Sequence, residues 1–587
     1  MRLMTEKWIT GGAPDDPGWG TGAAGGIPGV RTGPGCRVVV LADERARVVL
    51  VGDAGTVDEH RDELLGAAAR GEWTTLTRLP GAYWVLARNG ENMFVCGDLA
   101  GARAVFYARH GSHVRWSTSI GRLADHLAAR VDLPLMGAQI AVGPEHWPER
   151  TLYDGIRAVP GGFGLLLGRA GSVRVVDVSD TGVSCSLVEG AAVFGEALRG
   201  AVSVRMGSAG GLAGADVSGG LDSSTVAILA ARHGEICAVT YRDAYTSAED
   251  LLYARRVAGH IGTTLHIGEG RAGQRPFTWS EGQPSTEQPV AMSLNMPQQR
   301  IYLAPAAGRP VHLTGHGGDV VLDSSSAGFI ALVQTGRRRA ARKEITRWAR
   351  GHNRSPRTLW QTVAQHAELG HAGALRAAAA AIRTAGPGAF TGPSPVWTWC
   401  RPGPFAGWLT PYGRDRVAGL LDEASQHVLD ERADVAAQRD ALRMVGADVR
   451  DSIPLARDWG VRPAHPYLDN RVVRAAFAID PLERWSTVSF KPLLAAALPE
   501  LPVWLTGRTS KGSFTRQLIG GMSRRTDLAA LVQTSSFVTE GLVDASRALT
   551  ALSGIAGHHA TALHNLQRLV TACHWLAARD RMREGAC

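Results

Sequence analysis

A strand–loop–helix–strand segment near residue 220 constrains the fold of this chain most. A short predicted strand at 215–217 leads into the string Ser-Gly-Gly-Leu-Asp-Ser-Ser at 218–224. A helix at about 223–233 and a buried strand at 236–241 are predicted to follow. Two strands joined by such a helix lie parallel, with a right-handed crossover. The alternation continues with a predicted helix at 248–261 and predicted strands at 264–267 and 310–314, so the segment predicts an open parallel α/β sheet.

The pattern changes near residue 185. Before it, apolar runs pair into three predicted hairpins, at 37–51, 82–96 and 104–117. The second hairpin turns at Asn89-Gly90, a favoured tight-turn dipeptide. Beyond residue 327 the pattern is helical and is broken at 386–410. Because 587 residues are too many for one core, we predict two domains, 1–185 and 190–587.

Composition narrows the class of protein. The chain has 63 Lys and Arg against 54 Asp and Glu, a net charge of +9 that favours ATP or an acidic peptide as a partner. The basic run at 337–350 has the spacing of a solvated helix face, and no nucleic-acid-binding module is recognisable. The seven cysteines form no C-x-x-C pair, which favours a reducing compartment. No signal-peptide pattern or long apolar stretch is apparent, so we expect a cytoplasmic enzyme that binds neither nucleic acid nor membrane.

The loop at 218–224 has the chemistry of a phosphate-binding loop. Its glycines allow close backbone approach, and the helix that follows directs N–H groups at an anion. Ser218 and Ser223 offer hydroxyl donors, and Asp222 can hold Mg²⁺. It is not a Walker A loop, because no Gly-Lys-Ser/Thr follows. The alternative is a plain structural turn.

A second glycine-rich loop, Thr-Gly-His-Gly-Gly-Asp at 314–319, also follows a predicted strand. Loops at the carboxyl ends of neighbouring parallel strands converge on one crevice. Asp319 alone would be a turn residue. Together with Asp222, it predicts a shared metal-bound pyrophosphate site.

With both loops in place, the chain resembles the asparagine-synthetase superfamily, whose pyrophosphatase loop reads Ser-Gly-Gly-x-Asp-Ser. The resemblance covers nearly the whole chain; other similar segments are 81–85, 97–101, 159–162, 247–258, 462–469, 491–494 and 508–514. It implies an N-terminal glutaminase-like (Ntn-type) α/β sandwich, a parallel-sheet synthetase domain with helical additions, and ATP and Mg²⁺ as cofactors.

One difference from the family pattern determines which amine we expect to attack the activated carboxylate. Members that use glutamine carry a nucleophilic Cys after the initiator Met, whereas this chain has Arg2, and its first cysteine is Cys36. An N-terminal nucleophile uses its own α-amino group as the base, so Cys36 cannot replace it. We therefore expect no glutamine hydrolysis and an attacking amine on the substrate itself.

Members without that cysteine include β-lactam synthetases and lasso peptide cyclases. The basic helical stretch at 327–385 and the segment 408–412 are similar to those of actinobacterial lasso cyclases. This resemblance implies adenylation of an Asp or Glu side chain of a precursor (core) peptide. The peptide's α-amine then attacks to close an isopeptide macrolactam, and AMP and pyrophosphate are released. It also implies a wide crevice, which the 327–385 stretch could line, and possible partners in a leader-binding protein and a leader peptidase.

The resemblance also implies the roles of individual residues. Predicted ATP contacts are Val217, Ser218, Gly219, Gly220, Asp222, Ser223, Val239, Thr240 and Gly315, and predicted Mg²⁺ ligands are Asp222 and Asp319. Lys511 would stabilise charge on the carbonyl and phosphate, although Arg508-x-x-Lys511 is one residue longer than the family spacing. His316 could accept a proton from the amine, or only shape its loop.

Two alternatives stay open. The first is a β-lactam synthetase or another small-molecule amide ligase with the same chemistry. The second is a non-catalytic scaffold that binds a peptide.

Overall fold

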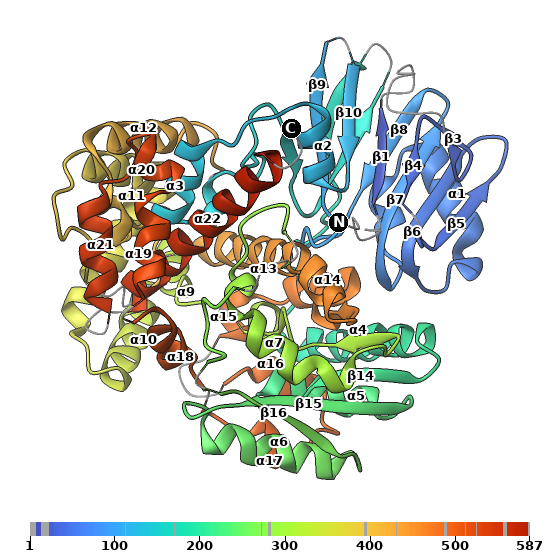
Figure 1. The fold of residues 1–587 in the computed structure, drawn as a ribbon. Helices are drawn as coiled ribbons and strands as arrows, with labels where there is room; N and C mark the ends of the chain where they lie inside the picture. The colour runs from blue at the N-terminus through green and yellow to red at the C-terminus, as the bar shows by residue number, and fades with distance from the viewer. Residues whose placement is uncertain are drawn as a thin grey trace.

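The computed structural model describes residues 8–12, 23–33, 35–111, 113–168, 171–271, 273–279, 283, 285–323, 325–392, 396–429, 431–485, 490–510, 512–523, 525–555 and 560–584. Figure 1 shows the N-terminal strands on one side of the molecule, the parallel sheet on another, and a lobe of helices opposite the strands. The predicted α/β fold class is confirmed, with antiparallel sheets first and a parallel sheet after them.

The N-terminal strands form two antiparallel sheets. The first has the order β11-β9-β10-β1-β4 and the second β13-β12-β8-β7-β6-β5. Apolar side chains of both sheets, such as Ile9, Trp84 and Trp116, share one cluster, so the sheets pack as a sandwich. All three predicted hairpins form. The elements are β1 (Ile9–Gly12), β2 (Ala23–Ala24), β3 (Ile27–Pro28), β4 (Arg31–Thr32), β5 (Val38–Ala42), β6 (Arg47–Ala54), η1 (Asp58–His60), α1 (Arg61–Arg70), η2 (Trp73–Thr77), β7 (Gly81–Asn89), β8 (Asn92–Cys96), β9 (Val105–His110), β10 (His113–Ser117), α2 (Ile120–His126), α3 (Leu133–Val142), η3 (Pro144–His146), β11 (Arg157–Val159), β12 (Phe163–Leu167) and β13 (Val173–Asp177).

The second sheet system is parallel throughout, in the order β16-β15-β14-β17-β18. Its central strand β14 begins at Leu212, three residues before the strand that we predicted at 215–217. Small residues are required there, because a Cβ on Gly214 would lie 2.5 Å from Nδ1 of His312. Such residues give a weak hydrophobic signal, which hides the strand. The elements are α4 (Leu187–Ser208), β14 (Leu212–Asp216), α5 (Leu221–Ala230), β15 (Glu235–Arg242), α6 (Ala248–His260), β16 (Leu265–Glu269), β17 (Val311–Leu313) and β18 (Pro463–Ala464).

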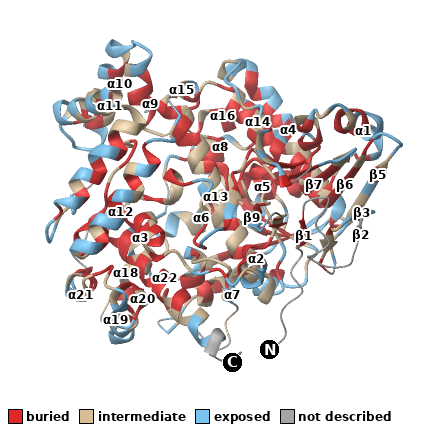
Figure 2. Ribbon diagram, turned by 90° about the horizontal axis from the view of Figure 1, so that it is seen from above, coloured by how far each residue is buried: buried red, intermediate tan, exposed pale blue. Residues whose placement is uncertain are grey.

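Helices make up almost all of the remaining described chain, as predicted beyond residue 327. Figure 2 shows buried residues along β6, β7, α5 and α14, whereas α10 and α11 carry exposed residues on their outer faces. The elements are η5 (Ala291–Asn295), α7 (Met296–Leu303), η6 (Ala304–Ala306), α8 (Gly318–Val321), α9 (Gly328–Gln334), α10 (Arg338–Gly351), α11 (Pro356–Arg383), η7 (Pro404–Trp408), α12 (Pro411–Ala424), α13 (Ala433–Asp458), η8 (Pro466–Leu468), α14 (Asn470–Ala478), α15 (Pro481–Arg484), α16 (Pro492–Ala497), α17 (Val503–Thr506), α18 (Thr515–Met522), α19 (Thr526–Gln533), α20 (Ser536–Thr539), α21 (Ala545–Ser553) and α22 (Ala560–Glu584).

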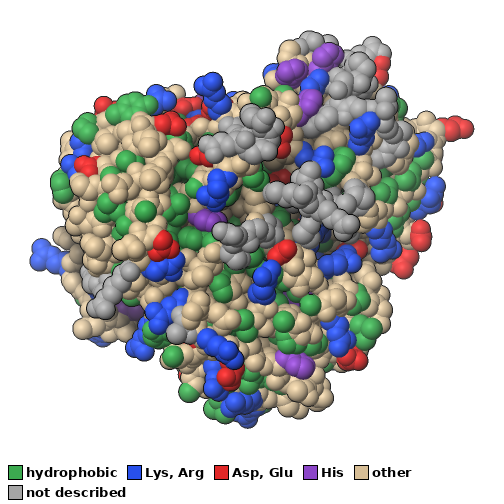
Figure 3. All heavy atoms as spheres, viewed as in Figure 1, with side chains coloured by type: hydrophobic (Ala, Val, Ile, Leu, Met, Phe, Trp, Pro, Cys, Tyr) green, Lys and Arg blue, Asp and Glu red, His purple; other side chains and the backbone are tan. Residues whose placement is uncertain are grey.

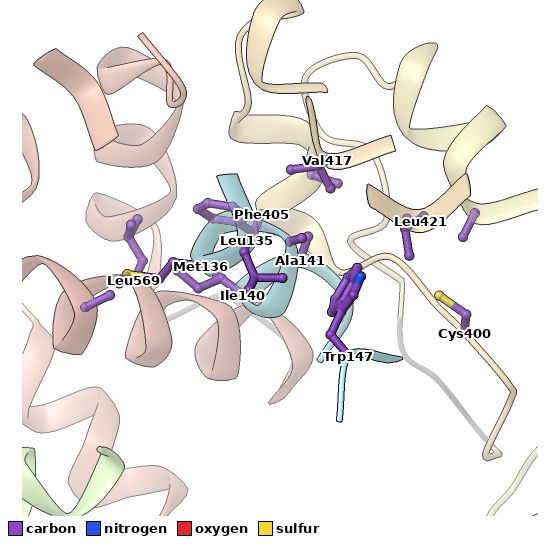
Figure 4. Close-up of a cluster of buried hydrophobic side chains, with 14 of the residues drawn as sticks. Leu135, Met136, Ile140, Ala141, Trp147, Cys400, Phe405, Val417, Leu421 and Leu569 are labelled. Carbon is purple, nitrogen blue, oxygen red and sulfur yellow. The ribbon is translucent and has the colours of Figure 1, made fainter. Parts of the chain in front are cut away.

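The helical lobe is built from both halves of the chain. Figure 4 shows Leu135, Met136 and Ile140 of α3 lying between Leu569 of α22 and Val417 of α12. The largest hydrophobic core therefore crosses the predicted domain boundary. Residues of both predicted domains, 1–185 and 190–587, contribute to this core. The division itself stays a prediction.

The basic run forms helix α10, as its spacing predicted. Ala341, Ile345 and Ala349 are buried, while the guanidinium groups of Arg338 and Arg342 lie over the ring of Trp360. Figure 3 shows Lys and Arg side chains dispersed over several regions of the visible face. No helix among the described residues is long and apolar enough to span a membrane.

The start of α14 joins the parallel-sheet region to the N-terminal sandwich. The carboxylate of Asp469 accepts hydrogen bonds from the backbone N–H of Gly81 (2.8 Å) and from Arg205 (3.0 Å). Asn470 accepts from the N–H of Leu99 (2.9 Å) and donates to the carbonyl of Thr77 (3.0 Å). Asp469 and Arg205 are both buried, so their ion pair lies inside this junction.

We expect Asp469→Ala to lower the free energy of unfolding by about 3–5 kcal/mol, because it leaves the Arg205 guanidinium buried without its carboxylate. Asp458→Ala is the control, since it removes an ion pair in which Arg300 is largely exposed and should cost no more than about 1 kcal/mol. Denaturant unfolding of both variants measures the difference. Equal, small losses would show that the junction does not depend on this pair.

Candidate functional site

The two glycine-rich loops are in direct contact. A Cβ on Gly315 would lie 2.6 Å from the backbone N of Ser223 and 3.0 Å from Cβ of Asp222. A Cβ on Gly318 would lie 2.5 Å from Cγ of Asp222. Only glycine fits at such approaches, so the second loop packs onto the first at the carboxyl ends of β14 and β17, as the parallel sheet predicted.

The backbone of the first loop lies close to helix α6, just before α5 begins. Gly219 has a φ of +84°, and a Cβ there would lie 2.2 Å from the carbonyl O of Asp250. The hydroxyls of Ser218 and Ser223 are 2.8 Å apart, and the N–H of Gly220 donates to Oγ of Ser218 (3.3 Å). No described side chain caps the helix, whose N-terminal N–H groups and dipole favour an anion.

Lys491 joins the two predicted metal ligands. Its ammonium group donates to both carboxylate oxygens of Asp222 (2.5 Å each) and to Oδ1 of Asp319 (2.8 Å). The Lys491 side chain is 2% exposed, whereas that of Asp319 is 59% exposed, so the cluster opens toward solvent on the Asp319 side. Burial opposes the charge on Lys491, but the two carboxylates outweigh burial and raise its pKa. Lys491 is therefore a cation at neutral pH.

Lys491 was not among the predicted site residues. It lies in the segment 491–494, which carried part of the family resemblance, but nothing in the local sequence links it to Asp222. Its backbone adopts the left-handed conformation (φ 50°) just before α16. For a residue other than glycine this conformation is uncommon and costs about 1 kcal/mol or more.

The carboxylate pair fits a magnesium ion that is shared with phosphate. Asp222 and Asp319 approach one ammonium group within 2.8 Å, so a small cation can reach both. Among the described residues, no group of three or more His, Cys, Asp and Glu side chains could hold a metal by itself. Mg²⁺ commonly uses one or two carboxylates and completes its shell with water and substrate phosphates.

Three of the predicted ATP contacts, Val217, Val239 and Thr240, lie on or directly after the central strands β14 and β15. The N–H of Val217 donates to the carbonyl of Val239 (2.8 Å), and both side chains are fully buried. Thr240 follows on β15 and is buried. The two valines contribute to different hydrophobic clusters, so they would offer backbone rather than side-chain contacts to a base.

Arg508 anchors the C-terminal segment to the first loop. Its guanidinium donates to the carbonyl of Gly219 and to the carboxylate of Asp250, and it lies 4.5 Å from the ring centre of Tyr253. A Cβ on Gly512 would lie 2.0 Å from Asp250 Oδ2. Lys511 itself lies outside the described residues, as does Arg2, so the role of Lys511 stays a prediction. Its neighbours on both sides are held beside the loop.

His316 occupies an exposed position on the second loop. Its backbone N–H (3.3 Å) and its Nδ1 (3.1 Å) both contact Oγ1 of Thr314, which also contacts Nδ1 of His465 (2.7 Å). Burial, and then the neighbouring imidazole of His316, lower the pKa of His465 well below its usual range, so His465 is neutral. Thr314 thus contacts Nδ1 of both imidazoles. Nε2 of His316 is then the ring nitrogen that can exchange a proton with a substrate.

We expect Gly315→Ala to weaken ATP binding by about tenfold to a hundredfold, because the added methyl group would collide with the backbone of Ser223. Overpacking of this kind costs about 1–3 kcal/mol. Gly259→Ala is the control, since a Cβ there meets nothing within 4 Å and the position is helical. Calorimetric titration with ATP measures both affinities. An unchanged affinity in Gly315→Ala would show that nucleotide binding does not depend on the contact between the two loops.

Comparisons of this chain with solved structures and with protein families both gave matches. Among solved structures, similarity extends to a glutamine phosphoribosylpyrophosphate amidotransferase from B. subtilis complexed with ADP and GMP, at 12% identity and a TM-score of 0.17 over 48% of this chain and 64% of that one. A second structure, described as the allosteric regulatory enzyme of purine biosynthesis, matches at 12% identity and a TM-score of 0.17 over 47% and 56%. The chain thus spans less than two thirds of either protein, and no curated protein matches it. The model of the asparagine synthase family matches residues 194–577, a span that contains both glycine-rich loops, Lys491 and Arg508. The chain belongs to the asparagine synthase family.

Proposed function

We propose that this chain is an ATP-dependent ligase that activates a carboxylate as an acyl-adenylate and joins it to an amine, releasing AMP and pyrophosphate. We propose further that it acts as a lasso peptide cyclase. The observation that supports the chemistry best is the meeting of Asp222, Asp319 and Lys491 beside the first glycine-rich loop. Three segments distant in sequence supply these side chains, which together suit a pyrophosphate group.

In the first step, a carboxylate oxygen of the substrate attacks the α-phosphorus of ATP, and the bond to pyrophosphate breaks. The N–H groups at the start of α5, with Ser218 and Ser223, bind the leaving pyrophosphate. The ammonium of Lys491 balances its charge at a buried position, where electrostatic stabilisation is strongest. Magnesium, held by Asp222 and Asp319, would supply further neutralisation of phosphate charge.

In the second step, the amine attacks the acyl carbon. The new C–N bond forms, the C–O bond to AMP breaks, and the amine loses one proton. Nε2 of His316 can accept that proton, because Nδ1 is held by Thr314 and the side chain is exposed to an entering substrate. By the family resemblance, Lys511 would stabilise the charge on the departing AMP.

The proposed acceptor is the α-amine of the peptide itself. The similarity of the 327–385 stretch to that of lasso cyclases supports a peptide. A precursor peptide is thus the proposed substrate, and a leader-binding protein and a leader peptidase are proposed partners.

The test incubates the protein with ATP, Mg²⁺ and a set of synthetic peptides, each with a free α-amine and one Asp or Glu. We expect AMP and pyrophosphate to form with at least one peptide, and that peptide to lose the mass of one water. Its N-acetyl derivative should not cyclise, because the nucleophile is blocked. Turnover of a small β-amino acid, or of aspartate with glutamine, and of no peptide would contradict the cyclase proposal.

A further inference from the structure

A cavity of about 540 Å³ lies between the N-terminal sandwich and helices α13 and α22. Its wall includes Phe106 of β9, Met136 of α3 and Trp147 after η3 on one side, and Met444 of α13 on the other. Pockets of 300–1,000 Å³ hold ligands far larger than one amino acid. The volume therefore suits several linked residues.

Helix α13 connects this cavity to the nucleotide site. Asp448 lines the cavity and interacts electrostatically with His316 of the second loop. His316 follows Gly315, which packs on the first loop beside Asp222. The cavity and the proposed site of adenylation are thus neighbours across one helix.

Asp448 differs from the other acids that α13 contributes to this wall. Asp451 accepts hydrogen bonds from Arg450 (2.8 Å), and Asp440 accepts from Arg439 (3.2 Å). The carboxylate of Asp448 has no hydrogen bond or ion pair with any residue that the structure describes, although the backbone carbonyl of Asp448 accepts from Oγ of Ser452. A half-buried carboxylate without a partner is costly, and a cation in the cavity would relieve that cost.

The remaining wall favours a peptide over a small polar ligand. Figure 4 shows Met136, Ile140 and Trp147 grouped around α3, and these side chains also line the cavity. Glu145 and Arg568 add polar groups to the wall, and burial raises the pKa of the Glu145 carboxyl group. An apolar surface with a few convergent polar groups is the usual composition of a ligand site.

We propose that this cavity binds the N-terminal segment of the peptide substrate, and that Asp448 holds its α-ammonium group next to His316. This assignment rests on the proposed function and extends it to the site of the nucleophile. An α-amine is largely protonated at neutral pH and forms a charge-assisted hydrogen bond with a carboxylate. The ammonium group loses one proton to solvent before it attacks, and His316 accepts the second proton, which is lost as the C–N bond forms.

This cavity is formed by other parts of the chain than the 327–385 stretch. That stretch, which on the sequence could line a wide crevice, forms the helices α9, α10 and α11. Among the described residues it contributes nothing to this cavity, and only His371 to a neighbouring one. The walls come from α13, α22 and the N-terminal half, because α3 inserts into the helical lobe.

The first test measures binding of two fluorescent synthetic peptides, labelled at the C-terminus, that differ only in a free or an acetylated α-amine. Wild-type protein should bind the free amine about tenfold to a hundredfold more tightly, the range of a charge-assisted hydrogen bond. Asp448→Asn keeps the side chain's shape, and it should bind both peptides alike. A preference that survives in Asp448→Asn, or no binding of either peptide by the wild type, would overturn the assignment.

The second test fills the cavity. Ala447→Trp places a large ring in the wall beside Asp448 and should weaken peptide binding at least about tenfold, while ATP affinity stays within about twofold. Val188→Trp is the size-matched control, because Val188 is 85% exposed on α4. A wild-type protein that forms no AMP with any peptide would refute the proposed function. A wild-type protein that forms AMP, with peptide affinity unchanged in Ala447→Trp, would refute only the cavity assignment.

Discussion

Asp222→Asn should reduce AMP formation by on the order of a thousandfold while leaving the fold intact. The substitution keeps the volume of the side chain but removes the charge that faces Lys491 at 2.5 Å. It also removes one of two carboxylates available to magnesium, and preorganised electrostatic groups at a reacting centre are commonly worth 10²–10³ in rate. Discontinuous measurement of AMP at saturating ATP tests the prediction.

The control for this variant is Asp458→Asn, which changes a carboxylate at the end of α13 that pairs with the largely exposed Arg300. It should keep nearly full activity. A non-catalytic scaffold would tolerate Asp222→Asn and would still bind peptide with unchanged affinity. Full AMP formation by Asp222→Asn would therefore show that this loop takes no part in the reaction.

Lys491→Met should produce a loss of both activity and stability. The substitution removes the ammonium group that contacts both the Asp222 carboxylate, whose side chain is 18% exposed, and the Asp319 carboxylate, whose side chain is 59% exposed. Because the contact with Asp222 is buried whereas Asp319 is largely exposed and screened by solvent, we expect a stability loss of about 1–3 kcal/mol. AMP formation should fall at least about a hundredfold, because the buried positive charge beside the leaving pyrophosphate is lost.

The effect of Mg²⁺ on the melting temperature of Lys491→Met tests specifically whether the two aspartates form a cation site. In the variant, Mg²⁺ should raise the melting temperature by more than it does in the wild type, since the ion replaces a missing positive charge between two carboxylates. Lys343→Met, which removes an exposed charge on α10, should melt like the wild type at every Mg²⁺ concentration. Equal Mg²⁺ effects in Lys491→Met and wild type would show that the two aspartates do not form a cation site.

The fold class was predictable because local patterns carry it. The alternation of strands and helices after residue 210 and the hairpins before residue 118 each depend on residues close in sequence. The loop at 218–224 was recognisable for the same reason, since its glycines, serines and aspartate are consecutive. Strand β14 was predicted too short because its alanines and glycine pack by being small, which leaves little hydrophobic pattern.

The rest of the site depends on contacts between distant segments, which no local pattern reveals. Lys491 reaches Asp222 only because α16 begins next to the loops, and a single lysine before Pro492 carries no sign of burial. Asp448 looks like any acid on an amphipathic helix until the cavity beside it is known. The contribution of α3 to the helical lobe was hidden too, because it joins residues some 280 to 430 positions apart.

The most direct measurement follows an oxygen atom. A substrate peptide carrying ¹⁸O in the reacting carboxylate is incubated with ATP and Mg²⁺, and the phosphate-containing products are separated by mass spectrometry. If the carboxylate attacks the α-phosphorus at the loop of Ser218 and Asp222, one ¹⁸O atom must appear in AMP and none in pyrophosphate. Label in inorganic phosphate, with ADP as the nucleotide product, would contradict adenylation and the role proposed here for this loop.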